Sequence, residues 1–65
     1  MTTGVVKWFS AERSFGFIVQ DASDDDCFVH ISNIEGEMLE AGDRVAFEVV
    51  STRKGSMALK VRRLK

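Results

Sequence analysis

The sequence has a single cysteine, Cys27, and no apolar run long enough for a signal sequence or a transmembrane helix. A lone cysteine excludes an internal disulfide and fits a reducing compartment. Without a membrane-length segment we expect neither a membrane span nor a membrane partner. A cytoplasmic location is the default expectation for such a chain.

The sequence also lacks the residue combinations that catalysis and metal binding require. Its only histidine, His30, has no evident nucleophile to activate. The acidic run Asp24–Asp26 lacks the alternating ligands, the central glycine and the distant glutamate of a calcium loop. No other spacing suits a metal, and Cys27 is interpreted as a small apolar core residue. We therefore expect no enzyme, no cofactor, no metal site and no small-molecule substrate.

The length and the charge distribution limit what the chain can be. Its 65 residues make one domain, 1–65, with a thin margin of stability. The net charge of -1 conceals an asymmetry: residues 1–50 hold ten acids and three bases, whereas residues 51–65 hold six bases and no acid. A nucleic-acid-binding domain is usually basic overall, so the total charge alone does not predict such a partner.

Five short stretches are rich in β-branched and aromatic residues and are bounded by turn-forming residues, which predicts strands. They are 4–10, 15–20, 27–31, 44–50 and 57–64. The stretch 34–41 is ambiguous, because glycines bracket it too tightly for a helix. Five such strands favour an all-β fold, a small closed antiparallel barrel, because closure removes exposed sheet edges.

Alternation along each stretch predicts which residues fill the barrel. In the last stretch it places Met57, Leu59 and Val61 on one side and Ala58 on the other. The residues expected in the interior are Val6, Ile18, Cys27, Val29, Ile34, Val45, Phe47, Val49, Leu59 and Val61.

The aromatic residues follow a period of two, with cations beside them. Residues i and i+2 of a strand share a face, so Phe15 and Phe17 point one way, as do Phe28 and His30. The aliphatic residues between them are the better core candidates, which leaves the rings outside. Exposed rings bordered by Lys and Arg can stack bases and attract phosphates. On spacing alone, ordinary core packing of these rings stays an open alternative.

Three motifs together resemble the bacterial cold-shock proteins and the wider cold-shock domain family. Lys7-Trp8-Phe9 comes first. Arg13–Ile18 is similar to the family's RNP1-like motif, usually Lys-Gly-Phe-Gly-Phe-Ile, and Cys27–Ile31 to its RNP2-like motif, usually Val-Phe-Val-His-Phe. The order and spacing agree, and the resemblance extends over essentially the whole chain. It implies a five-stranded OB-type barrel that binds single-stranded RNA and DNA.

The resemblance also implies roles for individual residues. The stacking surface, called the aromatic face below, would comprise Trp8, Phe15, Phe17, Phe28 and His30. Phe9 flanks it and either stacks or packs partly inward. Lys7, Arg13 and Lys54 would meet the backbone and base edges, and Asp26 would hydrogen-bond bases. Apart from the resemblance, the charge distribution suggests that the basic C-terminal end adds phosphate contacts through Lys60, Arg62 and Arg63, with a merely solubilising tail as the open alternative.

The chain departs from the family's pattern in places that bear on affinity. Ile31 stands where a further stacking aromatic is usual, and Ser14 where a glycine is usual. The segment 31–44 is shorter than usual and lacks the Gly-Phe or Gly-Tyr pair whose ring extends the stacking surface. At about 1–3 kcal/mol per stacked base, two lost positions would weaken binding. Phosphate contacts from the C-terminal end would compensate, with stronger salt dependence.

We therefore expect a protein that binds single-stranded nucleic acid by base stacking. It would act as an ATP-independent RNA chaperone or as a regulator of transcription or translation. The alternative is a diverged barrel that serves as a protein-interaction or dimerisation module, with the exposed aromatics as its contact residues. A monomer is expected, and a dimer that exchanges strands through the segment 34–42 is the variant to test against it.

Overall fold

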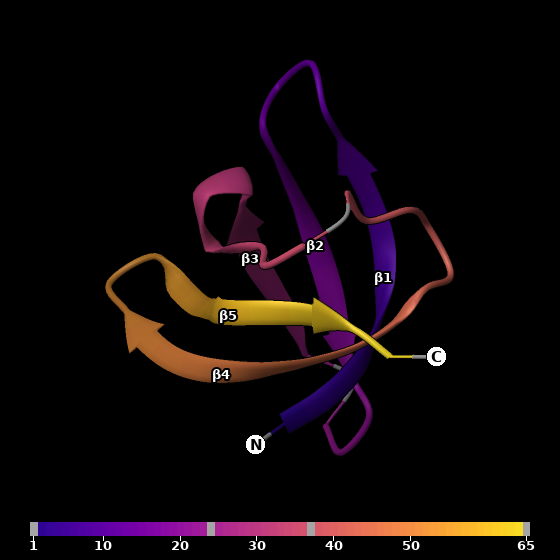
Figure 1. Ribbon diagram of the computed structural model, residues 1–65. Coiled ribbons are helices and arrows are strands. Elements are labelled where there is room, and N and C mark those ends of the chain that lie inside the picture. The colour runs from indigo at the N-terminus through magenta and orange to yellow at the C-terminus, as the bar shows by residue number, and fades with distance from the viewer. Residues whose placement is uncertain (1, 24, 37, 65) are drawn as a thin grey trace.

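Within the residues that the structure describes, 2–23, 25–36 and 38–64, five β-strands close into one barrel in the computed structural model (Figure 1). They are β1 (Thr2–Ser10), β2 (Phe15–Gln20), β3 (Asp26–His30), β4 (Arg44–Thr52) and β5 (Gly55–Arg63). A short 3-10 helix, η1 (Ile31–Asn33), follows β3 directly. No helix in the described part of the chain is long and apolar enough to cross a membrane. Asp24 of the acidic run lies outside the described residues.

The strands follow the order β1-β2-β3-β5-β4 around the barrel, and β4 pairs with β1 to close it. Neighbouring strands are antiparallel, except that β3 runs parallel to β5, where Phe28 lies beside Met57. In Figure 1 the β4–β5 hairpin, in orange to yellow, crosses the meander formed by β1, β2 and β3. The prediction of a five-stranded, OB-type barrel is confirmed, with the β3–β5 pairing as its departure from a purely antiparallel sheet. Ile31 was expected in the third strand but begins η1 instead.

The barrel interior is filled by aliphatic side chains, one cysteine and one phenylalanine. The buried residues are Val6, Ile18, Cys27, Val29, Leu39, Val45, Ala46, Phe47, Ala58 and Val61. Two of the expected core residues, Ile34 and Val49, are partly buried and pack against this cluster. Burial raises the pKa of the Cys27 thiol, chiefly through desolvation, so this side chain is held neutral as an apolar core residue.

A β-bulge in β5 explains why the prediction for Leu59 is wrong. The pairing of β5 with β4 shifts by one residue after Leu59, and Lys60 there has a left-handed φ of 52°. The extra residue breaks the alternation, so Ala58 faces inward before the bulge and Val61 faces inward after it. Leu59 is left only half-buried. Met57 accordingly lies on the outer side of the barrel.

Another bulge, in β1, determines which way the tryptophan points. Val6 and Trp8 pair with consecutive residues of β2, although they are two residues apart in β1, so Lys7 is the extra residue. Without the bulge, Val6 and Trp8 would share a face and the indole would point into the core. The bulge turns Trp8 outward beside Phe17, while Phe9 packs against the core.

Ser14 has a strained backbone at the end of the connection between β1 and β2. Its φ of 65° is left-handed, which costs a non-glycine residue roughly 1–2 kcal/mol. Glycine adopts this φ without strain but loses more backbone entropy on folding. We expect Ser14→Gly to raise the free energy of unfolding by about 1 kcal/mol, measured by urea denaturation. Ser14→Ala keeps the Cβ atom and is the control; an equal gain in both variants would contradict this account.

Candidate nucleic-acid interface

The rings of Trp8, Phe15, Phe17 and Phe28 meet on the outer side of β1, β2 and β3. The ring centroids lie 5.4 Å apart for Trp8 and Phe17, and 5.5 Å apart for Trp8 and Phe15. Phe28 lies 5.5 Å from Phe15 and 5.9 Å from Phe17. Trp8 is 37% exposed, and the three phenylalanines are half-buried. The structure thus places the rings outside the core, as alternation predicts for the three phenylalanines and the family resemblance predicts for Trp8.

The register of the strands brings these rings together. Phe17 lies opposite Trp8 of β1 and opposite Phe28 of β3, while Phe15 lies opposite His30. Directly opposed side chains in an antiparallel pair have Cβ atoms about 4.5–5.5 Å apart, so large rings touch. The face is therefore a product of cross-strand pairing, assembled from residues that lie two apart within β2 and β3.

Gly16 allows β1 and β2 to approach closely behind these rings. It lies opposite Phe9 in the sheet. A Cβ atom at this position would collide with the carbonyl oxygen of Trp8 and would come within 2.7 Å of the Phe9 ring. The half-buried Phe9 thus occupies the space that a side chain at position 16 would need, and it packs inward rather than extending the aromatic face.

His30, the remaining residue expected on the aromatic face, lies opposite Phe15 at the end of β3 and also caps η1. Its Nδ1 accepts a hydrogen bond from the backbone N–H of Ser32 at 3.1 Å and lies 2.9 Å from the Ser32 hydroxyl. These contacts hold the exposed ring in one orientation, and a neutral ring then carries its proton on Nε2. Among residues 2–23, 25–36 and 38–64, no group of three or more His, Cys, Asp or Glu side chains could hold a metal ion.

Lys7 and Lys54 lie beside the aromatic face, because Lys7 precedes Trp8 in β1 and Lys54 lines a pocket together with Phe17 and Phe28. Lys7 Nζ is 3.2 Å from an Asp26 carboxylate oxygen, and both side chains are exposed. An exposed pair of this kind contributes little stability, so it opens readily when either partner is offered a ligand. Arg13 is exposed in the connection between β1 and β2. Lys54 lies in the turn between β4 and β5.

The basic residues of the C-terminal end are not brought next to the aromatic face. Lys60 Nζ lies 3.5 Å from Glu48, and Arg63 Nη1 lies 3.5 Å from Asp43. Arg62 and Arg63 pair with the start of β4, at the opposite end of β5 from the residue that pairs with Phe28. At about 3.3 Å per strand residue, they lie on the order of 15 Å along the strand from that point. Their effect on a ligand at the aromatic face would be long-range attraction.

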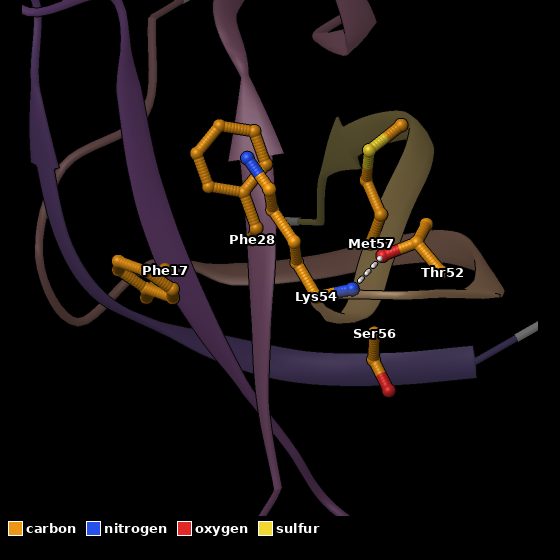
Figure 2. Close-up of a pocket in the computed structure, with 6 residues that line it drawn as sticks. All are labelled: Phe17, Phe28, Thr52, Lys54, Ser56 and Met57. Atoms are coloured by element: carbon orange, nitrogen blue, oxygen red, sulfur yellow. Dashed lines mark hydrogen bonds between the residues drawn. The ribbon is translucent and has the colours of Figure 1, made fainter.

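A pocket of about 410 Å³ continues the aromatic face toward the β4–β5 hairpin (Figure 2). Its lining consists of Phe17, Phe28, Thr52, Lys54, Ser56 and Met57. Sequence analysis missed three of these, Thr52, Ser56 and Met57. Alternation assigned Met57 to the core side, and nothing in the sequence indicated that β5 would pair with β3. In Figure 2 the Lys54 side chain extends from the turn in the direction of Phe28.

Comparisons with known proteins agree on one family and one fold. The family model described as the "'Cold-shock' DNA-binding domain" matches residues 2–64. The chain is 49% identical over 67 residues to the cold shock-like protein CspLB of Listeria monocytogenes, covering 98% of this chain and 100% of that protein. It is 48% identical over 63 residues to the cold shock-like protein CspG of Shewanella violacea, covering 92% and 90%. The solved structure of drosophila Unr CSD456 superposes with a TM-score of 0.80 over 98% of this chain and 26% of that one; at 18% identity, this likeness concerns the fold.

Proposed function

Because the chain belongs to the cold-shock DNA-binding domain family, a family of non-enzymatic binding proteins, we propose that its aromatic face binds single-stranded RNA and DNA by stacking their bases. The observation that carries the proposal is the cluster of Trp8, Phe15, Phe17 and Phe28 outside a core that is already filled. Every base has a π-face, so stacking of this kind tolerates many sequences. We therefore expect broad selectivity among single strands.

The charged residues at the edges supply the remaining interactions. When the exposed Lys7–Asp26 pair opens, the lysine can meet a phosphate and the carboxylate can accept hydrogen bonds from a base edge. Arg13 and Lys54 would meet the backbone and base edges of the bound nucleic acid. The C-terminal bases Lys60, Arg62 and Arg63 add to the attraction of phosphates, and this contribution weakens as salt rises.

Titration of Trp8 fluorescence tests the proposal directly. We expect a short oligothymidine to quench the indole and the corresponding duplex to leave it unchanged, because duplex bases are not free to stack on rings. Repeating the titration at low and moderate salt gives the number of phosphates neutralised, at a slope of about -0.7 per phosphate for single strands. If the folded protein shows no quenching at high micromolar strand, the proposal is overturned and the protein-interaction alternative takes its place.

Stacking of unpaired bases also implies an RNA-chaperone activity that needs no ATP, by which the protein would influence transcription or translation in the cytoplasm. A protein that binds only unpaired strands shifts RNA away from hairpins by mass action. We expect excess protein to lower the melting temperature of a weak RNA hairpin. A hairpin with a long G·C stem serves as the control and should move less. An unchanged melting temperature for the weak hairpin would remove the chaperone activity from the proposal.

A further inference from the structure

The β4–β5 hairpin carries a serine shortly after two adjacent cations. The sequence Arg53-Lys54-Gly55-Ser56 spans the turn and the first two residues of β5. Arg53, Lys54 and Gly55 are exposed, and Figure 1 shows this turn at the projecting end of the hairpin. Exposed loop tips are where enzymes that act on proteins, proteases above all, gain access to a chain. The function proposed above gives a role to Lys54 but none to Arg53 or Ser56.

The two cations of this turn are not neutralised by neighbouring side chains. Residues 51–65 hold six bases and no acid. Within the described part of the chain Arg53 and Lys54 form no ion pair, whereas Lys60 of the same hairpin lies 3.5 Å from Glu48. Because complementary charges steer proteins toward one another, the turn is suited to meet an acidic surface of another protein.

Ser56 has a hydroxyl that the fold does not use. The Thr52 hydroxyl is occupied by the turn, since it donates to the Gly55 carbonyl at 2.7 Å and accepts from the Lys54 N–H at 3.2 Å. The Ser56 hydroxyl has no hydrogen-bond partner among the described residues, and Ser56 is only half-buried. A reaction at the Ser56 oxygen would therefore break no side-chain contact of the described fold.

The spacing of the cations before Ser56 is the kind of charge pattern by which protein kinases select their substrates. Arg53 comes three positions and Lys54 two positions before the serine. Ser51, which lies directly opposite Ser56 in the hairpin, instead has Glu48 three positions before it. A kinase whose substrate groove is acidic would therefore favour Ser56 over Ser51.

A phosphate on Ser56 would lie beside the aromatic face. The Ser56 side chain lines the pocket together with Phe17, Phe28 and Lys54 (Figure 2). Phosphorylation adds a charge of about −1.5 to −2, which would offset the positive charge of Arg53 and Lys54. The added charge would repel the phosphates of a bound strand and would compete with them for Lys54.

We propose that Ser56 is a phosphorylation site for a serine kinase with an acidic substrate groove, and that this modification releases single-stranded nucleic acid from the aromatic face. In the reaction the Ser56 oxygen bonds to the γ-phosphorus of ATP, while the bond from that phosphorus to the bridging oxygen breaks and ADP leaves. The catalytic base of the kinase takes the hydroxyl proton. The release rests on the proposed function, whereas the modification itself does not.

Incubating the folded protein with Mg-ATP and a purified serine kinase tests the site, the kinase being one whose peptide substrates carry arginine three positions before the serine. We expect the intact protein to gain the mass of one phosphoryl group, which fragmentation places on Ser56. Ser56→Ala should abolish the gain. Replacing Arg53 and Lys54 together by glutamine keeps the hydroxyl and should slow the reaction roughly 10-fold or more, because the steering charges are lost. An unmodified protein, or a phosphate on another hydroxyl alone, would overturn the proposal.

Titration of the phosphorylated protein with oligothymidine, followed by Trp8 fluorescence, tests the release. We expect roughly 10-fold weaker binding at low salt, and a smaller difference at moderate salt because screening reduces the repulsion. Treatment with a phosphatase should restore the affinity. Ser56→Glu carries a single charge and should weaken binding about 3-fold. Its matched control, Ser56→Gln, has nearly the same shape without the charge and should bind like the unmodified protein. Thermal unfolding of each variant checks that it is folded.

The outcomes separate this inference from the proposed function. Equal affinity of the phosphorylated and unmodified proteins would overturn the release and leave the aromatic face intact. Equal weakening by Ser56→Glu and Ser56→Gln would show that bulk and not charge is responsible, which also overturns the release. If the unmodified protein binds no strand, the proposed function fails and the release fails with it, while the mass measurement still decides whether Ser56 is a phosphorylation site.

Discussion

Replacing Phe28 with alanine is expected to weaken binding of oligothymidine by about 1–3 kcal/mol, or roughly 5- to 150-fold, the effect of losing one stacked base. Phe28 lies in the middle of the aromatic face, nearly parallel to Phe15 at an interplanar angle of 29° and edge-on to Phe17 at 75°. It also forms part of the pocket wall. The ring contacts of Trp8 are with Phe15 and Phe17, which the variant keeps, so its fluorescence still reports binding.

The matched control for this prediction is Phe28→Tyr. It keeps the ring face, and the half-buried position at the surface lets the added hydroxyl reach water. We expect its affinity to stay close to that of the unmodified protein. Thermal unfolding of both variants checks the fold. A large fall in melting temperature with unchanged affinity in Phe28→Ala would mean that the ring serves stability, and the assignment of this residue to the binding face would be wrong.

Gly16→Ala is expected to have the largest effect on stability. Besides meeting the Trp8 carbonyl oxygen, the new Cβ atom would lie 2.7 Å from Cδ2 and 2.8 Å from Cα of Phe9. Two of these three contacts are with backbone atoms, so relief requires β1 and β2 to move apart. Overpacking typically costs about 1–3 kcal/mol and more where the backbone must shift. A domain this small has only about 3–5 kcal/mol available, so urea denaturation should show the variant mostly unfolded.

Gly36→Ala provides the comparison for this substitution. Gly36 has a φ of +88°, and a Cβ atom built there meets nothing within 4 Å. Its cost is therefore the backbone strain alone, roughly 1–2 kcal/mol. Equal losses in the two variants would contradict the close approach of β1 and β2 as the cause. At temperatures where part of the Gly16→Ala protein remains folded, Trp8 quenching by oligothymidine should fall along with the folded fraction.

Period-two patterns sufficed to predict most of the barrel, because they record which face of a strand is apolar. They placed Ile18 and Val29 inside and Phe17 and Phe28 outside without any tertiary information. The strand positions also followed from composition, since turn-forming residues bound each stretch, but β1 and β5 begin two residues earlier and β4 ends two residues later than predicted. Ile31 and Leu64, the last residues of two predicted strands, lie outside β3 and β5.

The features that alternation could not predict are the two bulges and the pairing of β3 with β5. At Lys7 and Lys60 the bulges carry no glycine, so no local signal marks them. By alternation with Val6, Trp8 would point inward; the family resemblance predicted its outward position. The family motifs do not include Met57, so they gave no prediction of its position. The pocket beside it therefore follows only from the three-dimensional arrangement of the strands.

The order of the strands along the chain separates the binding surface from the core that supports it. The rings of the aromatic face all come from β1, β2 and β3, which are joined by consecutive antiparallel pairings. Closure instead joins β1 to β4 and β3 to β5, across long stretches of chain, and such distant contacts are slow to form. During synthesis, the aromatic face is therefore complete once the growing chain includes His30. At that point neither β4 nor β5, the strands of the closing hairpin, has been made.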